Sequence, residues 1–229
     1  MSLIQAESGQ GESLFDRVPW VYAFCREHLF RDDTATIVTH LWPNGVPLAG
    51  SSVVELGCGP GFYARGLAAH DPRVAAAGLD RSAAQLADAR QRARRAGLAN
   101  CRFDLGDVAA MPYPDGSVDA LIAARLFVLV DQPERVLDEM HRVLRPGGRA
   151  FIAEPLSALQ ARLTLGLMQL ADRFGRSGCP SAGRRLERID VLDDARFAAL
   201  VGSQPWLHVA HWIDDGYRYA VLQKAGPAT

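Results

Sequence analysis

The sequence contains a glycine-rich turn that is suited to holding a ligand against its backbone. In "VVELGCGPGFYARGL", glycines occupy every second position, at Gly57, Gly59 and Gly61, between an apolar run and a helix-like stretch. Glycine permits unusual backbone angles at such a turn and lets a ligand approach closely. A dinucleotide fingerprint needs G-x-G-x-x-G, but Phe62 stands at its third glycine, and no lysine follows as a P-loop requires. Pyrophosphate and triphosphate ligands are therefore both disfavoured.

Acidic residues stand at three points around this turn. Glu55 precedes it, where a carboxylate repels a phosphate but can pair with an ammonium, directly or through water. Asp80 closes the next strand-like run, and a carboxylate there can accept from both hydroxyls of a ribose. Asp107 closes a third such run and could accept from an exocyclic amine. A ligand with a ribose, an adenine and an ammonium but no phosphate suits these groups, and S-adenosylmethionine has those parts.

Four pieces of the segment from Val53 to Arg149 resemble the class I S-adenosylmethionine-dependent methyltransferases. The likeness is greatest to the small-molecule branch, methyltransferase type 11, which includes quinone-biosynthesis methyltransferases. The pieces are "VVELGCGPGFYARGL", "GLDRSAAQLADAR", "GDVAAMPYPDGSVDAL" and "VLDEMHRVLRPGGRAFIAEP". They follow one another in order at family-like intervals. The resemblance implies an enzyme that binds S-adenosylmethionine and releases S-adenosylhomocysteine.

The resemblance also implies which residues bind this cofactor. They are Tyr22, Glu55, Gly57, Cys58, Gly59, Gly61, Asp80, Arg81, Asp107, Val108, Arg125 and Leu126. The turn around Cys58, through its backbone, would hold the methionine end together with Glu55. Arg125 and Leu126 would flank the sulfonium and the methionine part. Tyr22, on an N-terminal helix, would contact the cofactor from a lid, although plain helix packing is the alternative.

The nucleoside end is assigned to the two strand ends that follow the turn. Asp80 would bind the ribose hydroxyls, with Arg81 alongside the adenine. Asp107 and the Val108 backbone N–H would read the adenine edge. The alternatives are that both aspartates are ordinary helix-cap or turn residues, and that the arginines from Arg81 onward form a solvated helix face.

A general base is needed only if the acceptor must lose a proton early, because the sulfonium is already an activated methyl donor. Glu154, at the end of the fifth predicted strand, is the candidate that topology favours. It could instead be a capping or buried hydrogen-bonding carboxylate. Other candidates are His28, His40, His208 and His211. The family often has a small or polar residue followed by histidine where this chain reads "ARLFVLV", so we draw no base from that segment.

Alternating strand-like and helix-like runs must position these residues. Strands are predicted at 51–56, 74–80, 101–107, 118–124 and 149–155, and helices at 62–70, 82–95 and 133–144. This alternation predicts an α/β fold, a Rossmann-like, seven-stranded, mostly parallel sheet with helices on both faces. A C-terminal hairpin around Asp215-Gly216 completes the sheet, with the last strand antiparallel. Helices at 14–29 and 33–42 precede it.

The chain is interpreted as a single methyltransferase domain, 1–229. Residues 1–48 form an N-terminal helical cap, 49–155 the cofactor-binding core, 156–190 a helical insertion or cap, and 191–229 the last helix and hairpin. A leucine stripe from Leu159 to Phe174 is left open as core packing, a cap over the pocket or a dimer face. Aromatic and aliphatic residues in the added segments favour a small, mostly apolar or aromatic acceptor.

Composition narrows the partners. The net charge of −1 gives no argument for nucleic acid, and no apolar run is long enough to span a bilayer. The four cysteines lack metal-ligand spacing, so no metal is expected. The start lacks the features of a signal peptide, which favours a cytoplasmic location. Monomer and homodimer both stay open. Alternative functions are a tRNA or protein methyltransferase, and a catalytically silent S-adenosylmethionine-binding protein.

Overall fold

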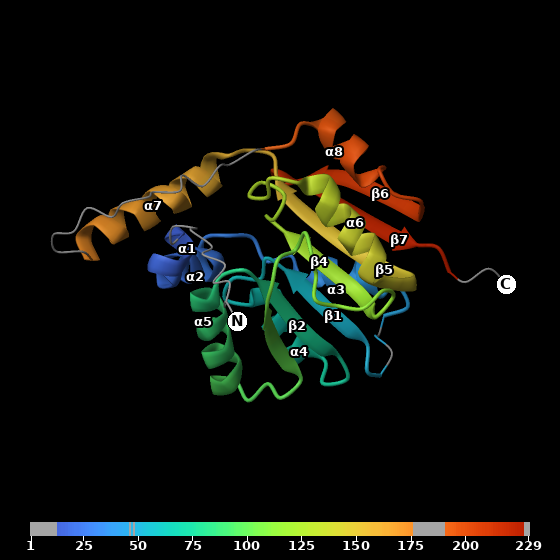
Figure 1. The fold of residues 1–229 in the computed structure, drawn as a ribbon, viewed down its shortest axis with the longest axis horizontal. Coiled ribbons are helices and arrows are strands. Elements are labelled where there is room, and N and C mark those ends of the chain that lie inside the picture. The colour runs from blue at the N-terminus through green and yellow to red at the C-terminus, as the bar shows by residue number, and fades with distance from the viewer. Residues whose placement is uncertain (1–12, 46, 48, 176–190, 227–229) are drawn as a thin grey trace, which may run out of the picture.

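A seven-stranded sheet lies at the centre of the molecule, in the order β3-β2-β1-β4-β5-β7-β6 (Figure 1). This computed structural model describes residues 13–45, 47, 49–175 and 191–226. The strands are β1 (Ser52–Leu56), β2 (Ala75–Asp80), β3 (Cys101–Leu105), β4 (Val118–Ala124), β5 (Leu144–Pro155), β6 (Trp206–Asp214) and β7 (Tyr217–Lys224). Strands β1 to β5 pair in parallel, and β7 runs antiparallel to both of its neighbours. The predicted fold class is confirmed.

Helices cover both faces of this sheet (Figure 1). They are α1 (Leu14–Arg17), α2 (Pro19–His28), α3 (Thr34–Leu41), α4 (Phe62–His70), α5 (Ala83–Arg95), α6 (Pro133–Val143), α7 (Leu159–Gly175) and α8 (Asp194–Val201). On one face, Val136 of α6 and Phe197 of α8 pack with Leu121 of β4. On the other, Leu67 of α4 and Ile37 of α3 join the second core cluster. The two apolar layers follow from strands that are apolar on both sides.

Local sequence signals set most of the helix starts. Pro19 and Pro133 each occupy the first turn of a helix, where a missing N–H costs nothing. Ser82 caps α5 by accepting the Gln85 backbone N–H at 3.2 Å. The spacing of Ser82 and Gln85 is that of a capping box, but only half of one forms, because the Gln85 side chain donates to the Phe15 carbonyl instead. The strand predicted at 149–155 begins earlier, at Leu144.

Helix α7 corrects one interpretation of the leucine stripe. Leu159, Leu163, Leu167 and Leu170 are 62%, 60%, 47% and 50% exposed, so they are not core packing. The buried face carries Met168, which packs with α1 and α2 at Val18, Val21 and Cys25. The cap and dimer interpretations stay predictions, and residues 176–190 of the predicted insertion lie outside the described residues. No described helix is long and apolar enough to cross a membrane.

Asp33 joins the N-terminal helices to the sheet. The sequence predicts it as the start of a helix, yet its carboxylate makes no cap hydrogen bond to α3. It accepts instead from the hydroxyls of Tyr63, at 3.2 Å, and Tyr219, at 2.9 Å, and it pairs with Arg31 at 3.0 Å. The side chain is fully buried, so these partners replace the water it has lost. Asp33 therefore ties α3 to α4 and β7.

We expect Asp33→Asn to lower the free energy of unfolding by about 2–3 kcal/mol, because an amide NH₂ then faces buried donors. Urea denaturation measures the loss. The matched control is Asp214→Asn, which removes a carboxylate from the same Arg31 at a side chain that is 57% exposed. That exposed pair should contribute less than about 1 kcal/mol. Equal losses in the two variants would contradict the role given to Asp33.

Candidate active site

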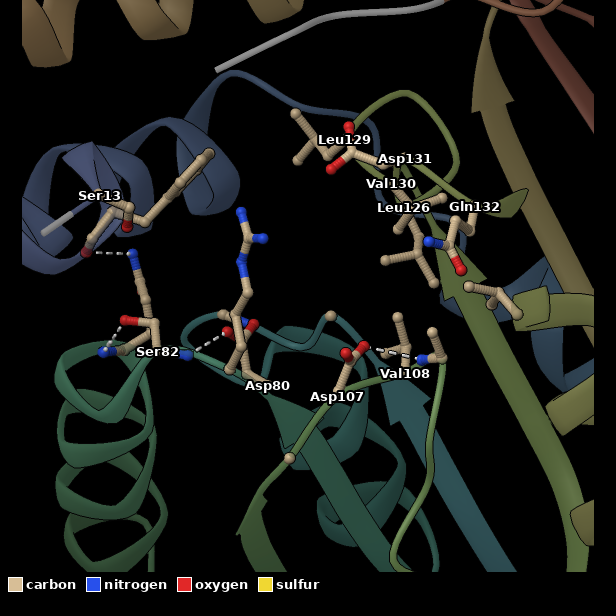
Figure 2. Close-up of a pocket in the computed structure, with 18 of the residues that line it drawn as sticks. Ser13, Asp80, Ser82, Asp107, Val108, Leu126, Leu129, Val130, Asp131 and Gln132 are labelled. Atoms are coloured by element: carbon tan, nitrogen blue, oxygen red, sulfur yellow. Dashed lines mark hydrogen bonds between the residues drawn. The ribbon is translucent and has the colours of Figure 1, made fainter. Parts of the chain in front are cut away.

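The carboxyl ends of the first four strands open into a cavity of about 330 Å³ (Figure 2). Among the predicted site residues, those that line it are Tyr22, Gly57, Gly59, Asp80, Arg81, Asp107, Val108, Arg125 and Leu126. Figure 2 shows Asp80 and Asp107 beside one another at one end of the cavity, with the loop from Leu126 to Gln132 across from Ser13. This is the edge of a parallel sheet at which ligands bind.

The glycine turn forms one wall of the cavity, and its lack of side chains is a spatial requirement. Gly57 and Gly59 have φ values of 60° and 50°. A Cβ on Gly59 would lie 2.9 Å from the Tyr22 ring, and one on Gly57 would lie 2.8 Å from Leu126. The turn therefore presents bare backbone to the cavity, between helix α2 and the loop after β4.

Asp80 holds the glycine turn against the end of β2. One carboxylate oxygen accepts the Gly59 N–H at 2.8 Å, and the other accepts the Ser82 N–H at 2.8 Å. Burial raises the pKa of Asp80. The alternative interpretation of Asp80 as a turn residue thus describes part of what it does. The same carboxylate lines the cavity, so it is also available to a ligand's hydroxyl groups.

Asp107 and Val108 line the cavity on the same side as Asp80 (Figure 2). Asp107 is exposed, and its Oδ1 accepts the Ala109 N–H at 2.8 Å. Val108 is half-buried. The structure adds cavity residues that sequence reasoning missed, namely Ser13, Ser82, Gln85, Gly106, Ala109, Ala110, Leu129, Val130, Asp131, Gln132, Arg135 and Val136. Several of them lie soon after the end of β4, and this position past a strand end is the sequence signal that could have identified them.

Three predicted residues do not line the cavity: Glu55, which precedes the turn, and Cys58 and Gly61, which belong to it. The Glu55 carboxylate accepts the Ala64 N–H at 2.8 Å in the first turn of α4, and burial raises its pKa to about 7. Cys58 donates its N–H to the Leu79 carbonyl, and burial raises the pKa of its thiol. A Cβ on Gly61 would meet the Phe103 ring at 2.3 Å. The structure thus gives these residues a supporting position.

Glu154, the candidate base, also lies outside the cavity lining. It is 2% exposed, and its oxygens accept the backbone N–H groups of Leu126, Phe127 and Val128 at 2.8, 2.9 and 3.2 Å. Burial raises its pKa to about 7. The geometry matches the alternative predicted for it, a buried hydrogen-bonding carboxylate that positions the loop after β4.

The other candidate bases are equally remote from the cavity. None of His28, His40, His208 and His211 lines it. His40 stacks on Trp212 at 4.7 Å between ring centroids, and His28 lies 4.9 Å from the Phe24 ring. Within the described part of the chain, no group of His, Cys, Asp and Glu side chains could hold a metal ion. The cavity therefore offers positioning groups rather than a histidine base.

Comparison with known proteins agrees with this arrangement. A family described as "Methyltransferase domain" matches residues 48–182, more than half of the chain. The chain belongs to this family. An uncharacterized methyltransferase of Mycobacterium sp. (strain JLS) is 31% identical over 185 residues, which are 75% of this chain and 71% of that protein. The membership confirms the resemblance to the class I S-adenosylmethionine-dependent methyltransferases.

Other matches show how far the likeness extends. Methyltransferase GfsG of Streptomyces halstedii is 40% identical over 107 residues, 46% of this methyltransferase chain. The chain covers only 38% of that relative's length. A solved structure of a putative S-adenosyl-L-methionine-dependent methyltransferase from Methanococcus maripaludis superposes with a TM-score of 0.67, over 98% of this chain and 100% of that one. At 16% identity, this structural match shows only that the two proteins share a fold.

We expect the stability of this methyltransferase domain to fall as the pH rises from about 5 to 8. Glu55 and Glu154 have pKa values near 7 in the folded state against an ordinary value of 4.5, so the folded state holds protons that the unfolded chain releases. The stabilisation is complete below 4.5 and is lost as the pH passes 7. Urea midpoints across this range measure the slope.

Glu154→Gln should make this slope shallower and lower stability at pH 5 by about 1–3 kcal/mol, because its NH₂ faces the Val128 N–H. The control, Glu134→Gln, changes an exposed acid on α6 and should leave the slope as it is. An unaltered slope in Glu154→Gln would show that this carboxyl does not titrate as described.

Proposed function

We propose that this protein transfers a methyl group from S-adenosylmethionine to an N, O or C atom of a small, mostly apolar or aromatic metabolite, and releases S-adenosylhomocysteine. The observation that carries the proposal is the cavity itself, in which a bare glycine turn and two strand-end aspartates face one space. The family membership supports the same donor.

The residues around the cavity suit this donor part by part. Tyr22 and Leu126 leave no room for a Cβ on Gly59 and Gly57, and the bare backbone that results suits the methionine end. Asp80 and Asp107 provide oxygens for the ribose hydroxyls and the adenine amine. Val108, with its half-buried apolar side chain, suits the flat face of the base. We keep Tyr22 as the lid contact, because its ring lies over Gly59.

Three of the predicted cofactor residues take a supporting role in this proposal. Glu55, Cys58 and Gly61 act behind the turn, through its shape, because none of them lines the cavity. Glu154 likewise acts through the loop that includes Leu126, whose side chain does line it. We therefore propose positioning rather than proton abstraction for Glu154.

The rest of the cavity favours an acceptor with an apolar body. Phe15, Leu129, Val130 and Val136 line it without offering a charge. They come from α1, from the loop after β4 and from α6. We also propose that the segment before β1 and the helix after β5 form the cap over this space, since α7 packs on α1 and α2.

The mechanism rests on placement. When bound, S-adenosylmethionine supplies a sulfonium-activated methyl group. The chain's task is to hold the acceptor atom in line behind that methyl and to exclude water, which is proximity and orientation catalysis. Glu154 fixes the backbone of residues 126–128 with three hydrogen bonds, and Asp80 fixes Gly59. Both walls of the cavity are thereby held before a ligand enters.

The absence of a nucleic-acid partner and the choice between monomer and homodimer stay predictions. The net charge of −1 supports a partner other than nucleic acid, and a tRNA methyltransferase would require a basic surface that the composition does not suggest. A monomer, a homodimer and a cytoplasmic location remain to be measured by sedimentation and by fractionation.

Calorimetry with S-adenosylhomocysteine tests the donor site. We expect Asp80→Ala and Asp107→Ala each to weaken binding by about ten- to a hundredfold, because each removes charge-assisted hydrogen bonds. Asp88→Ala is the control, since Asp88 pairs with Arg92 on α5 and does not line the cavity. Thermal melts confirm that each variant is folded. Undiminished binding in both cavity variants would refute the site.

A further inference from the structure

Arg125 is a buried cation that lines the cavity without a counter-ion. It is 9% exposed and directly follows β4. Its Nε and Nη1 atoms have no hydrogen-bond partner within the described part of the chain. A buried guanidinium with two unpartnered nitrogens is costly, because the water that these atoms have lost is not replaced. The Tyr63 side chain forms one hydrogen bond with Arg125, and a ligand in the cavity could supply another.

The acids around Arg125 are already engaged. The Glu154 carboxylate accepts hydrogen bonds from backbone N–H groups of the loop after β4, and the Glu55 carboxylate accepts one from the Ala64 N–H. Aromatic rings occupy other sides of the guanidinium, with Phe30 at 5.1 Å and Tyr217 at 5.9 Å from its carbon. These rings hold the group in place and partly offset its charge, but they are not an anion.

The backbone at Arg125 indicates that its position matters. Its φ of 57° is in the left-handed region, which side chains other than glycine rarely adopt. Its N–H donates to the Ala153 carbonyl at 2.7 Å, so β5 holds the residue in this conformation. Strained residues of this kind concentrate at functional sites.

A second buried cation increases the excess of positive charge. Arg26 of the lid helix α2 is 3% exposed and has an Nη2 atom without a partner among the described residues. Burial lowers its pKa, and the nearby Arg125 lowers it further. Burial raises the pKa of Glu55 and Glu154 to about 7, so near neutral pH these two acids offset only part of this charge. A sulfonium in the cavity would add one more positive charge.

We propose that the acceptor substrate carries an anionic group, a carboxylate or a phosphate, and that Arg125 receives it in the cavity. This inference rests on the proposed function and specifies its substrate class as an apolar body with one anionic end. The two unpartnered nitrogens, Nε and Nη1, lie on different edges of the guanidinium, so the anionic group would accept a charge-assisted hydrogen bond from the one that faces it. The donor's own methionine end carries both an ammonium and a carboxylate, so it leaves the excess charge unchanged.

Binding to the complex with S-adenosylhomocysteine tests the proposal. The probes are matched pairs, 4-hydroxybenzoate with methyl 4-hydroxybenzoate, and decanoate with methyl decanoate, with phenyl phosphate compared with phenol. For at least one pair we expect the anion to bind about tenfold or more tightly than its neutral partner. Arg125→Gln should abolish that preference, and Arg125→Lys should keep part of it.

The same variants separate the acceptor from the donor. The resemblance places Arg125 beside the methionine part of the donor, whereas this proposal assigns it to the acceptor, so Arg125→Gln should lower the affinity for the anion far more than the affinity for S-adenosylhomocysteine. The control is Arg102→Gln, an exposed arginine on β3, which should change neither affinity. A loss of about tenfold in S-adenosylhomocysteine affinity would overturn the proposal, because Arg125 would then serve the methionine carboxylate. Equal binding of anions and neutral partners, or no anion bound, would also overturn it. If the unaltered protein fails to bind S-adenosylhomocysteine, the proposed function itself fails.

Discussion

Buried carboxylates that accept backbone N–H groups hold this active-site edge together. Each of three strands has an acid among its last two residues that fixes a neighbouring segment: Glu55 of β1 fixes α4, Asp80 of β2 fixes the glycine turn, and Glu154 of β5 fixes the loop after β4. Parallel strands leave such N–H groups without ladder partners at the point where the chain turns away. The carboxylates supply those partners, so the cavity walls are set by the scaffold before any ligand binds.

This arrangement has an electrostatic cost that affects the site. Carboxylates removed from water keep protons more readily, so Glu55 and Glu154 offset less of the nearby positive charge than two exposed acids would. Arg125 and Arg26 lie in the same region with unpartnered nitrogens. The buried groups around Arg125 and Arg26 are therefore short of negative charge, although the chain as a whole is almost neutral and Asp80, Asp107 and Asp131 line the same cavity.

The sequence predicted the scaffold well because its signals are local. Periodicity placed the strands, and strand ends placed Asp80 and Asp107 beside the turn. The direction in which a side chain points could not be predicted from the neighbouring residues in the sequence. A strand-end carboxylate can point into the cavity or toward a neighbouring loop, and nothing near Glu154 in the sequence reveals that it points to Leu126. The exposure of the α7 leucines could not be predicted either, because that helix packs on α1 and α2 rather than on the sheet.

The packing of α7 has a mechanical consequence. It lies beside α1 and α2, away from the sheet (Figure 1), with Met168 buried between them and Asp172 paired with Arg17 at 3.2 Å. Tyr22 sits on the same lid, over Gly59. A shift of α7 would therefore displace α1 and α2, and with them Tyr22 over the glycine turn. The exposed leucines of α7 are thus connected to the cavity through packed residues.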